Sequence, residues 1–155
     1  MRTPTWRTLK RLLLLFWAVW LSLVVAGNTT DALRAMGTLP ADFSFASGNY
    51  EAILEVASPM ELPNSLCAFL YAGVIAWETL SMALFWIAAV KMPRAGARSA
   101  ILPLTFMVGL GLWAAFQIAC EALPSPLAYN LAGTHRLLFT EQLATLLAVV
   151  LLPDE

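Results

Sequence analysis

Long apolar runs separated by short polar segments dominate the pattern of this chain. The longest run covers residues 66–90 and contains a single charged residue, Glu78. As an α-helix it would be about 37 Å long, which is enough to cross a bilayer with some tilt. Three more apolar runs lie at about 8–27, 100–123 and 134–152. The pattern therefore predicts four membrane-spanning helices.

Residues 28–65 form the one long segment between these runs. Its first residues carry side-chain oxygens that cap helix N-termini, and Gly37 offers a stop, so a short helix is expected at about 30–36. Further along, apolar residues recur with helical spacing at Tyr50, Ile53, Leu54 and Ala57. This spacing predicts a short amphipathic helix within 48–57, lying on the membrane surface or on the bundle.

The remaining connections, at 91–98 and 124–133, are short, and short connections make neighbouring helices antiparallel. Thr134 is a good N-cap for the last helix. The expected fold is an all-α membrane protein with a single domain over residues 1–155. It is an antiparallel four-transmembrane-helix bundle with short amphipathic helices in its first outer loop, residues 28–65.

Composition supports lipid as the solvent. Hydrophobic residues make up 60% of the chain and charged residues 12%, with a mean hydropathy of +0.74. Soluble domains carry about 25% charged residues, so this chain has too little polar surface to cover a globule. The lipid bilayer is therefore an expected partner. The net charge of −1 gives no signature of nucleic-acid binding.

The distribution of positive charge predicts the topology. Residues 1–11 carry four Lys or Arg and residues 91–98 carry three, whereas 28–65 carries one. Because positive loops stay in the cytoplasm, both termini and the 91–98 connection are expected there. The 28–65 loop then lies outside, which is the periplasm if the membrane is a bacterial inner membrane.

A secretory signal is the alternative for the first apolar run. A basic start, an apolar core and Val24-x-Ala26 fit a signal peptide cleaved after Ala26. Trp17 and Trp20 are bulky for such a core, so a retained membrane helix is the favoured interpretation.

Polar residues within the predicted helices suggest contacts across the bundle. Counted at about 1.5 Å per residue from the helix ends, Glu78 lies level with Trp113 and Thr145. Glu78 is expected to face the bundle interior, and either to be protonated or to accept hydrogen bonds from one or both of these side chains. Two further pairs are expected at matching depths, Glu141 with Gln117 and Glu121 with Arg136.

These carboxyl groups allow two interpretations. A polar contact that fixes the register of the helices is the favoured one, since polar groups in lipid seek partners. A proton path that uses Glu78 and Glu141 as carriers is the alternative. Such a path needs continuity, and no ionisable residue lies on the cytoplasmic side of Glu78 in its helix before the basic connection.

The remaining reactive residue types are few. Cys67 and Cys120 both fall near the outer ends of their helices, where two unpaired buried thiols are favoured over a disulfide. His135 is interpreted as a solvated residue at the start of the last helix, with a metal or pigment ligand as the alternative. Two cysteines and one histidine exclude a four-ligand zinc site built from Cys and His within one copy. No catalytic residue, metal or cofactor is expected.

Several short motifs resemble a bacterial family of small integral membrane proteins catalogued only as a domain of unknown function. They are Asn28-x-x-Asp31 after the first apolar run, Ser58-Pro59, and Ile75-Ala76-Trp77-Glu78. The four-helix plan with a long first outer loop is also similar to that family. The resemblance implies an inner-membrane protein and brings no known reaction with it.

The expected function is that of a non-enzymatic accessory or structural subunit. It would pack against the subunits of a larger membrane protein complex, for which respiratory and photosynthetic complexes are candidates. The first alternative is a small oligomeric transporter or proton-conducting protein. The second is a membrane enzyme acting on lipid or quinone, for which only His135, Arg136 and Glu121 form a polar cluster near the interface.

Overall fold

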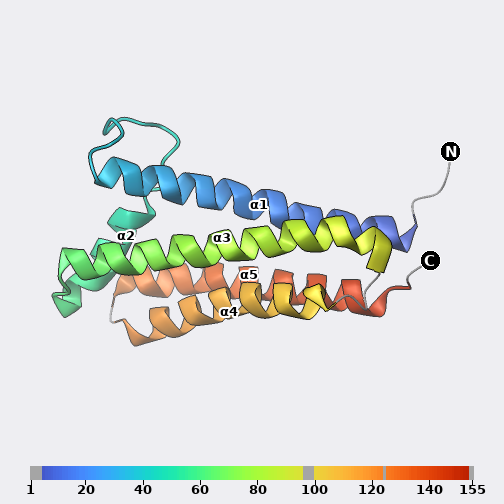
Figure 1. Ribbon diagram of the computed structural model, residues 1–155. Helices are drawn as coiled ribbons and strands as arrows, with labels where there is room; N and C mark the ends of the chain where they lie inside the picture. The colour runs from blue at the N-terminus through green and yellow to red at the C-terminus, as the bar shows by residue number, and fades with distance from the viewer. Residues whose placement is uncertain (1–4, 96–99, 124, 154–155) are drawn as a thin grey trace.

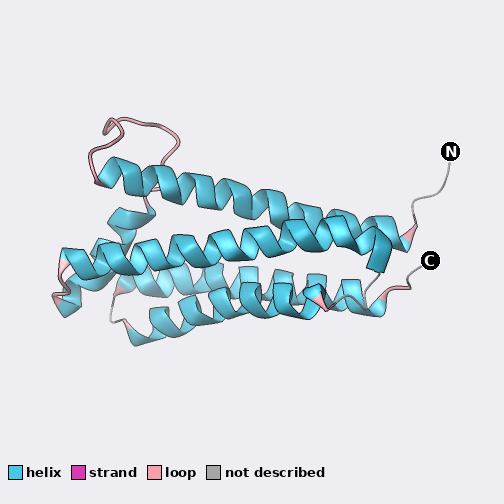
Figure 2. Cartoon of the chain, viewed as in Figure 1, coloured by secondary structure: helices cyan, strands magenta, loops and turns pink. Residues whose placement is uncertain are grey.

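The computed structural model describes residues 5–95, 100–123 and 125–153. Within these ranges the chain is all-helical, and Figure 2 shows the helices and their connections. In chain order the elements are α1 (Trp6–Ala35), α2 (Asn49–Ala57), the short 3-10 helix η1 (Ser58–Met60), α3 (Asn64–Ala95), α4 (Ile101–Ala122) and α5 (Pro126–Leu151).

The four long helices run side by side along the long axis of the molecule (Figure 1). Helix α1 packs mainly on α3, α3 also packs on α4, and α4 packs on α5. Helix α2 contacts α1, α3 and α5 at one end, which we call the α2 end. At the opposite end, which we call the terminal end, α1 begins, α3 ends, α4 begins and α5 ends. The all-helical architecture is thus confirmed.

Three helical segments are long and apolar enough to cross a membrane: Trp6–Ala35, Asn64–Met92 and Ile101–Ala122. Helix α5 is as long as a membrane span but is not among them. A multi-pass membrane protein agrees with these findings, whereas the role of α5 as a fourth span stays a prediction.

Helix α1 does not end near residue 27, and the separate helix expected at 30–36 is wrong. One continuous helix extends to Ala35. The side chains expected to cap that separate helix, those of Asn28, Thr30 and Asp31, form other hydrogen bonds instead. The hydroxyl of Thr30 donates back to the Ala26 carbonyl at 3.0 Å, and Asn28 and Asp31 turn their side chains toward other elements. Side chains satisfied in this way leave the helical backbone uninterrupted.

Helix α5 begins at Pro126, so the loop expected at 124–133 and the N-cap role of Thr134 are wrong. Proline is favourable in the first helical turn because its missing N–H would have no intrahelical partner there. Helix α3 likewise extends beyond the predicted 66–90, from Asn64 to Ala95. It includes the first part of the expected 91–98 connection, of which residues 96–99 lie outside the described ranges. The amphipathic helix expected within 48–57 is confirmed as α2.

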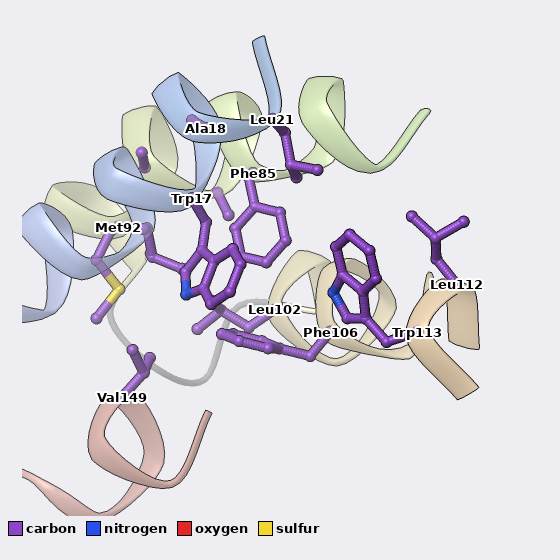
Figure 3. Close-up of a cluster of buried hydrophobic side chains, with 13 residues drawn as sticks. Trp17, Ala18, Leu21, Phe85, Met92, Leu102, Phe106, Leu112, Trp113 and Val149 are labelled. Carbon is purple, nitrogen blue, oxygen red and sulfur yellow. The ribbon is translucent and has the colours of Figure 1, made fainter. Parts of the chain in front are cut away.

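An apolar core fills the half of the bundle near the terminal end. Trp17 of α1, Phe85 of α3 and Phe106 of α4 meet there, with ring centroids 6.2 Å apart for Trp17–Phe85 and 5.4 Å for Phe85–Phe106. Figure 3 shows these rings directed into the space between the helices, with Val149 of α5 closing the cluster. The buried polar side chains of Asn28, Asp31 and Glu78 lie toward the α2 end instead, whereas the buried Lys10 lies in the first turns of α1.

Large apolar side chains also cover the outside of the bundle. Phe69, Met107, Ile118 and Leu151 are each more than 70% exposed. A soluble surface of this kind would be unusual. Such side chains suit contact with lipid or with another membrane protein.

Candidate functional site

A buried polar cluster joins α1, α3 and the start of α2. Asn28 and Asp31 stand three residues apart on α1, so they share one face of that helix. Tyr71 and Glu78 stand seven residues apart on α3, which again places them on one face. All four side chains are at most 3% exposed. We call them, together with Ser47 and Asn49, the polar clamp.

Asn28 connects two elements through the two ends of its amide. Its Nδ2 donates to Glu78 Oε2 at 2.8 Å, and its Oδ1 accepts from Asn49 Nδ2 at 2.8 Å. An acceptor on one side and a donor on the other fix the orientation of the amide. Glu78, within the span of α3, is therefore linked through Asn28 to the first residue of α2.

Asp31 collects four donors on its carboxylate. Its Oδ1 accepts from Arg34 Nη2 at 2.9 Å. Its Oδ2 accepts from the Tyr50 backbone N–H at 2.8 Å, from the Tyr71 hydroxyl at 3.1 Å and from Ser47 Oγ at 3.3 Å. Hydrogen bonds to an ionised acceptor are stronger than those between neutral groups. The carboxylate therefore fixes α1, α3 and residues 36–48 relative to one another. Residues 36–48 connect α1 to α2 on the outside of the bundle, and we call them the outer segment (Figure 1).

Asp31 also caps the N-terminus of α2, because the residue at the N-cap position cannot. The residue before α2 is Gly48, which has no side chain to cap the helix and adopts φ 75°. This left-handed conformation strains residues that have a Cβ, so glycine suits the position. Because helix N-termini attract negative charge, the Asp31 carboxylate stabilises α2 through the Tyr50 N–H.

The outer segment before α2 folds back along α1. The Ser47 backbone N–H donates to the Gly27 carbonyl at 3.2 Å, and the Thr30 hydroxyl is bonded to the Phe45 carbonyl. These contacts place the Ser47 side chain beside Asp31. The polar clamp thus consists of donors and acceptors that are largely satisfied by one another.

The contacts expected for Glu78 are wrong. Thr145 Oγ1 accepts from Trp17 Nε1 at 3.0 Å and donates to the Glu141 carbonyl at 2.9 Å, and neither bond involves Glu78. Trp113 Nε1 is buried without a hydrogen-bond partner among the described residues. The buried face of α3 at Glu78 is turned to α1, where Asn28 donates to the carboxylate.

The other expected pairs give a mixed result. Arg136 Nη2 lies 3.8 Å from Glu121 Oε1, so this pair is formed; both side chains are more than 60% exposed, and such pairs contribute little to stability. Glu141 is exposed. Gln117 Nε2 donates to the Trp113 carbonyl of its own helix at 3.4 Å, and no contact with Glu141 is found in the described part of the chain.

His135 is not a solvated residue at a helix start, because α5 begins nine residues earlier, at Pro126. Its half-buried ring stacks on Phe116 with centroids 4.8 Å apart, and its Nδ1 lies 3.5 Å from Cys120 Sγ. Cys67 and Cys120 are both free and buried. Over the described ranges, no group of three or more His, Cys, Asp or Glu side chains is placed to hold a metal ion.

Sequence reasoning missed Tyr71, Ser47 and Asn49 as members of the polar clamp. Tyr71 had a usable signal, since its seven-residue spacing from Glu78 puts both on one helical face. Ser47 and Asn49 had none, because they reach the clamp only when the outer segment folds back. Two of the three motifs that resemble the bacterial family, Asn28-x-x-Asp31 and the one ending in Glu78, converge in this clamp. The third, Ser58-Pro59, starts η1 and is exposed.

A second feature is an open apolar groove between α3 and α4, which we call the α3–α4 groove. It has a volume of about 520 Å³ and is lined by Ala76, Trp77, Leu80, Leu104, Met107 and Val108. Trp77 Nε1 donates to the Val108 carbonyl at 3.0 Å, which holds one wall of the groove in place. The groove lies about half-way along α3 and near the start of α4.

Comparison of the chain with protein-family models, with curated proteins and with solved structures gave no significant match. The relation to the bacterial family therefore stays a prediction.

Proposed function

We propose that this chain is a non-enzymatic accessory subunit that packs against a larger membrane protein complex through the α3–α4 groove. The groove is the observation that carries the proposal. Four of its six lining side chains, those of Trp77, Leu80, Leu104 and Met107, are large, apolar and at least 40% exposed. Side chains of a partner's transmembrane helix would fill this space and gain dispersion contacts there.

The polar clamp supports a structural role for the rest of the molecule. Its carboxylate at Asp31 is saturated by four donors, and its carboxylate at Glu78 is bonded to Asn28. Groups engaged in this way stabilise a fixed arrangement of helices. A rigid bundle with an apolar groove on its outside matches a subunit that binds by surface complementarity.

The proposed placement is the bacterial inner membrane, with both termini in the cytoplasm and the 28–65 segment in the periplasm. It rests on the charge counts. In the molecule, the start of α1, the end of α3, the start of α4 and the end of α5 lie at the terminal end, away from α2 (Figure 1). One orientation in the membrane therefore places all the basic segments on one side.

The test is purification from the native membrane in a mild detergent, followed by native electrophoresis and mass spectrometry. We expect a large assembly that contains this chain. Met107→Trp changes a lining residue of the groove and should reduce the fraction in the assembly. Ile118→Trp, at an equally exposed position on the same helix but outside the groove, is the control. Migration of the unaltered chain only as a monomer or small homo-oligomer would refute the proposal.

One observation favours the transporter alternative. The hydrogen bonds from Asn49 through Asn28 to Glu78 run from an exposed side chain to a carboxyl group within the span. Glu141, the second proposed carrier, is exposed and is not joined to Glu78. Proton flux into liposomes that is abolished by Glu78→Gln would establish this function in place of the accessory role. A wild-type protein without flux would exclude it.

A further inference from the structure

Three buried polar side chains on three different helices lack a hydrogen-bond partner among the described residues. They are Ser81 of α3, Trp113 of α4 and Gln142 of α5, the last with both amide atoms unpaired. All three are at most 3% exposed. An unpaired buried amide or hydroxyl costs about 1–3 kcal/mol, so three such groups in one bundle need a physical explanation.

The contacts of α3 show that Ser81 faces the bundle axis. Glu78 and Trp86 form hydrogen bonds to α1, whereas Trp77 and Leu84 form them with α4. At about 100° per residue, Ser81 is rotated by about 60° from Glu78 toward the side that faces α4. It therefore lies between the two contact faces, pointing to the space that all four long helices surround.

Gln142 and Trp113 reach the same space from the other two helices. Gln142 packs on Gly109, where a Cβ would lie only 2.5 Å from Gln142 Oε1. Trp113 follows Gly109 by one turn on the same face of α4, and its ring contacts Trp20 of α1 with centroids 5.8 Å apart. In Figure 3 its nitrogen is turned toward the interior of the cluster.

The hydrogen bonds between α3 and α4 place the three side chains at neighbouring levels of the bundle. The hydrogen bonds from Trp77 to Val108 and from Thr105 to Leu84 set the register of α3 and α4. Ser81 lies between Trp77 and Leu84 along α3, so it stands opposite residues 105–108 of α4. Gly109, which contacts Gln142, follows directly. Trp113 follows Gly109 by one further turn on α4, so the Cα atoms of Ser81 and Trp113 are about two turns apart along the bundle. The long Trp113 side chain leans toward the N-terminus of α4, and so back toward the level of Gly109.

We propose that Ser81, Trp113 and Gln142 form an internal water-binding site at the centre of the bundle. Their chemistry is complementary to water. The indole N–H of Trp113 only donates, the Gln142 carbonyl accepts, and the Ser81 hydroxyl and the Gln142 amide add further donors. A water molecule accepts from some of these groups and donates to others. Buried water typically makes about three such bonds to groups that protein atoms leave unpaired.

The site extends the polar interior of the bundle beyond the clamp. Glu78, which the clamp bonds to Asn28, precedes Ser81 by one turn on α3. Polar groups then occupy the bundle axis from the α2 end to the level of Gln142. The site borders the apolar core of Figure 3, of which the ring of Trp113 is itself a part. This site is independent of the proposed accessory function, because it lies inside the bundle and the groove lies outside.

The first test measures whether Gln142→Met raises or lowers the Tm. If Gln142 simply lacked a partner, Gln142→Met would remove an uncompensated amide of similar shape and raise the Tm. If water is bound, Gln142→Met removes the two amide atoms that form hydrogen bonds with it and leaves Ser81 and Trp113 with incomplete hydrogen bonding. The Tm of the full chain should then fall by about 2–4 °C. Leu146→Met, one turn further on α5, controls for the effect of a buried methionine. A Tm above that of the wild type would overturn the proposal.

The second test observes the water directly. In the full chain reconstituted into liposomes, solid-state NMR measures magnetisation transfer from water to the indole protons. We expect rapid transfer to Trp113 that is lost in Gln142→Met. Trp17 is the internal control, since it is 1% exposed and donates to Thr145 Oγ1. No transfer to Trp113, or equal transfer to Trp17, would overturn the assignment.

Discussion

Replacing Glu78 tests the deepest contact of the polar clamp. Glu78→Leu removes the acceptor of the Asn28 Nδ2 hydrogen bond, which is 2.8 Å long and lies between side chains that are 2% and 3% exposed. The amide of Asn28 has no second acceptor for this donor in the described part of the chain. Its other end stays bound to Asn49, so it cannot turn without breaking that bond as well.

The magnitude follows from these contacts. Hydrogen bonds between side chains in membrane proteins contribute about 0.6–1.7 kcal/mol, and a buried donor left unpaired costs about 1–3 kcal/mol. Glu78→Leu should therefore lower the free energy of unfolding by about 1–2 kcal/mol. Glu78→Gln keeps a carbonyl acceptor and should change it by less than about 0.5 kcal/mol. Glu78→Lys offers only donors to Asn28 and should lower it by about 3 kcal/mol.

The assay is reversible unfolding of the full chain in mixed micelles, with the same series repeated in an Asn28→Leu background. In that background Glu78→Leu should be nearly neutral, because neither partner of the bond remains. The coupling energy of this double-mutant cycle should be about 1 kcal/mol. A coupling energy near zero would refute the contact. The contact would also be refuted if Glu78→Gln lowered the free energy of unfolding as much as Glu78→Lys while Glu78→Leu left it unchanged.

Three further predictions follow from other contacts. Asp31→Ala leaves the Tyr50 N–H without its acceptor, so it should lower the free energy of unfolding by about 2–3 kcal/mol and speed proteolysis of the outer segment; an unchanged proteolysis rate would contradict the capping role. Gly109→Val should loosen the α4–α5 contact and lower the Tm by several degrees, whereas Gly133→Val, with open space around its Cβ, should have little effect; equal effects would refute the close approach. Cysteine labelling from outside intact cells should reach Asp42→Cys but not Lys91→Cys, in a background without the two native thiols; the reverse pattern would invert the topology.

The apolar runs determined the helices of this protein by themselves. A stretch such as 66–90 cannot be solvated by water, and inside lipid its backbone groups are satisfied only by a helix. The amphipathic spacing of Tyr50, Ile53, Leu54 and Ala57 likewise sufficed to predict α2. These properties depend on neighbours within a few residues along the chain, so they can be read without knowledge of the fold.

The start of α5 could also have been predicted from the sequence. Ser125 followed by Pro126 is a local signal for a helix start, with proline in the first turn. Thr134 competed with it as a possible N-cap, and reading the preceding residues as a loop placed the helix two turns too late. Two valid local signals were present, and only the packing of α5 on α4 decided between them.

The partners of the polar side chains were decided by the tertiary structure. Depth along a helix can be counted from the sequence, but the count does not reveal which neighbour a given face meets. Glu78 therefore pairs with Asn28 of α1 rather than with Trp113 or Thr145, the partners expected from the depth count. Asn28 and Asp31 have side chains that could equally cap a helix, and α3 and the folded-back outer segment satisfy them instead. A polar group takes the partner that packing brings within about 3 Å. That partner is 50 positions away in the chain for Asn28 and Glu78, and 128 positions away for Trp17 and Thr145.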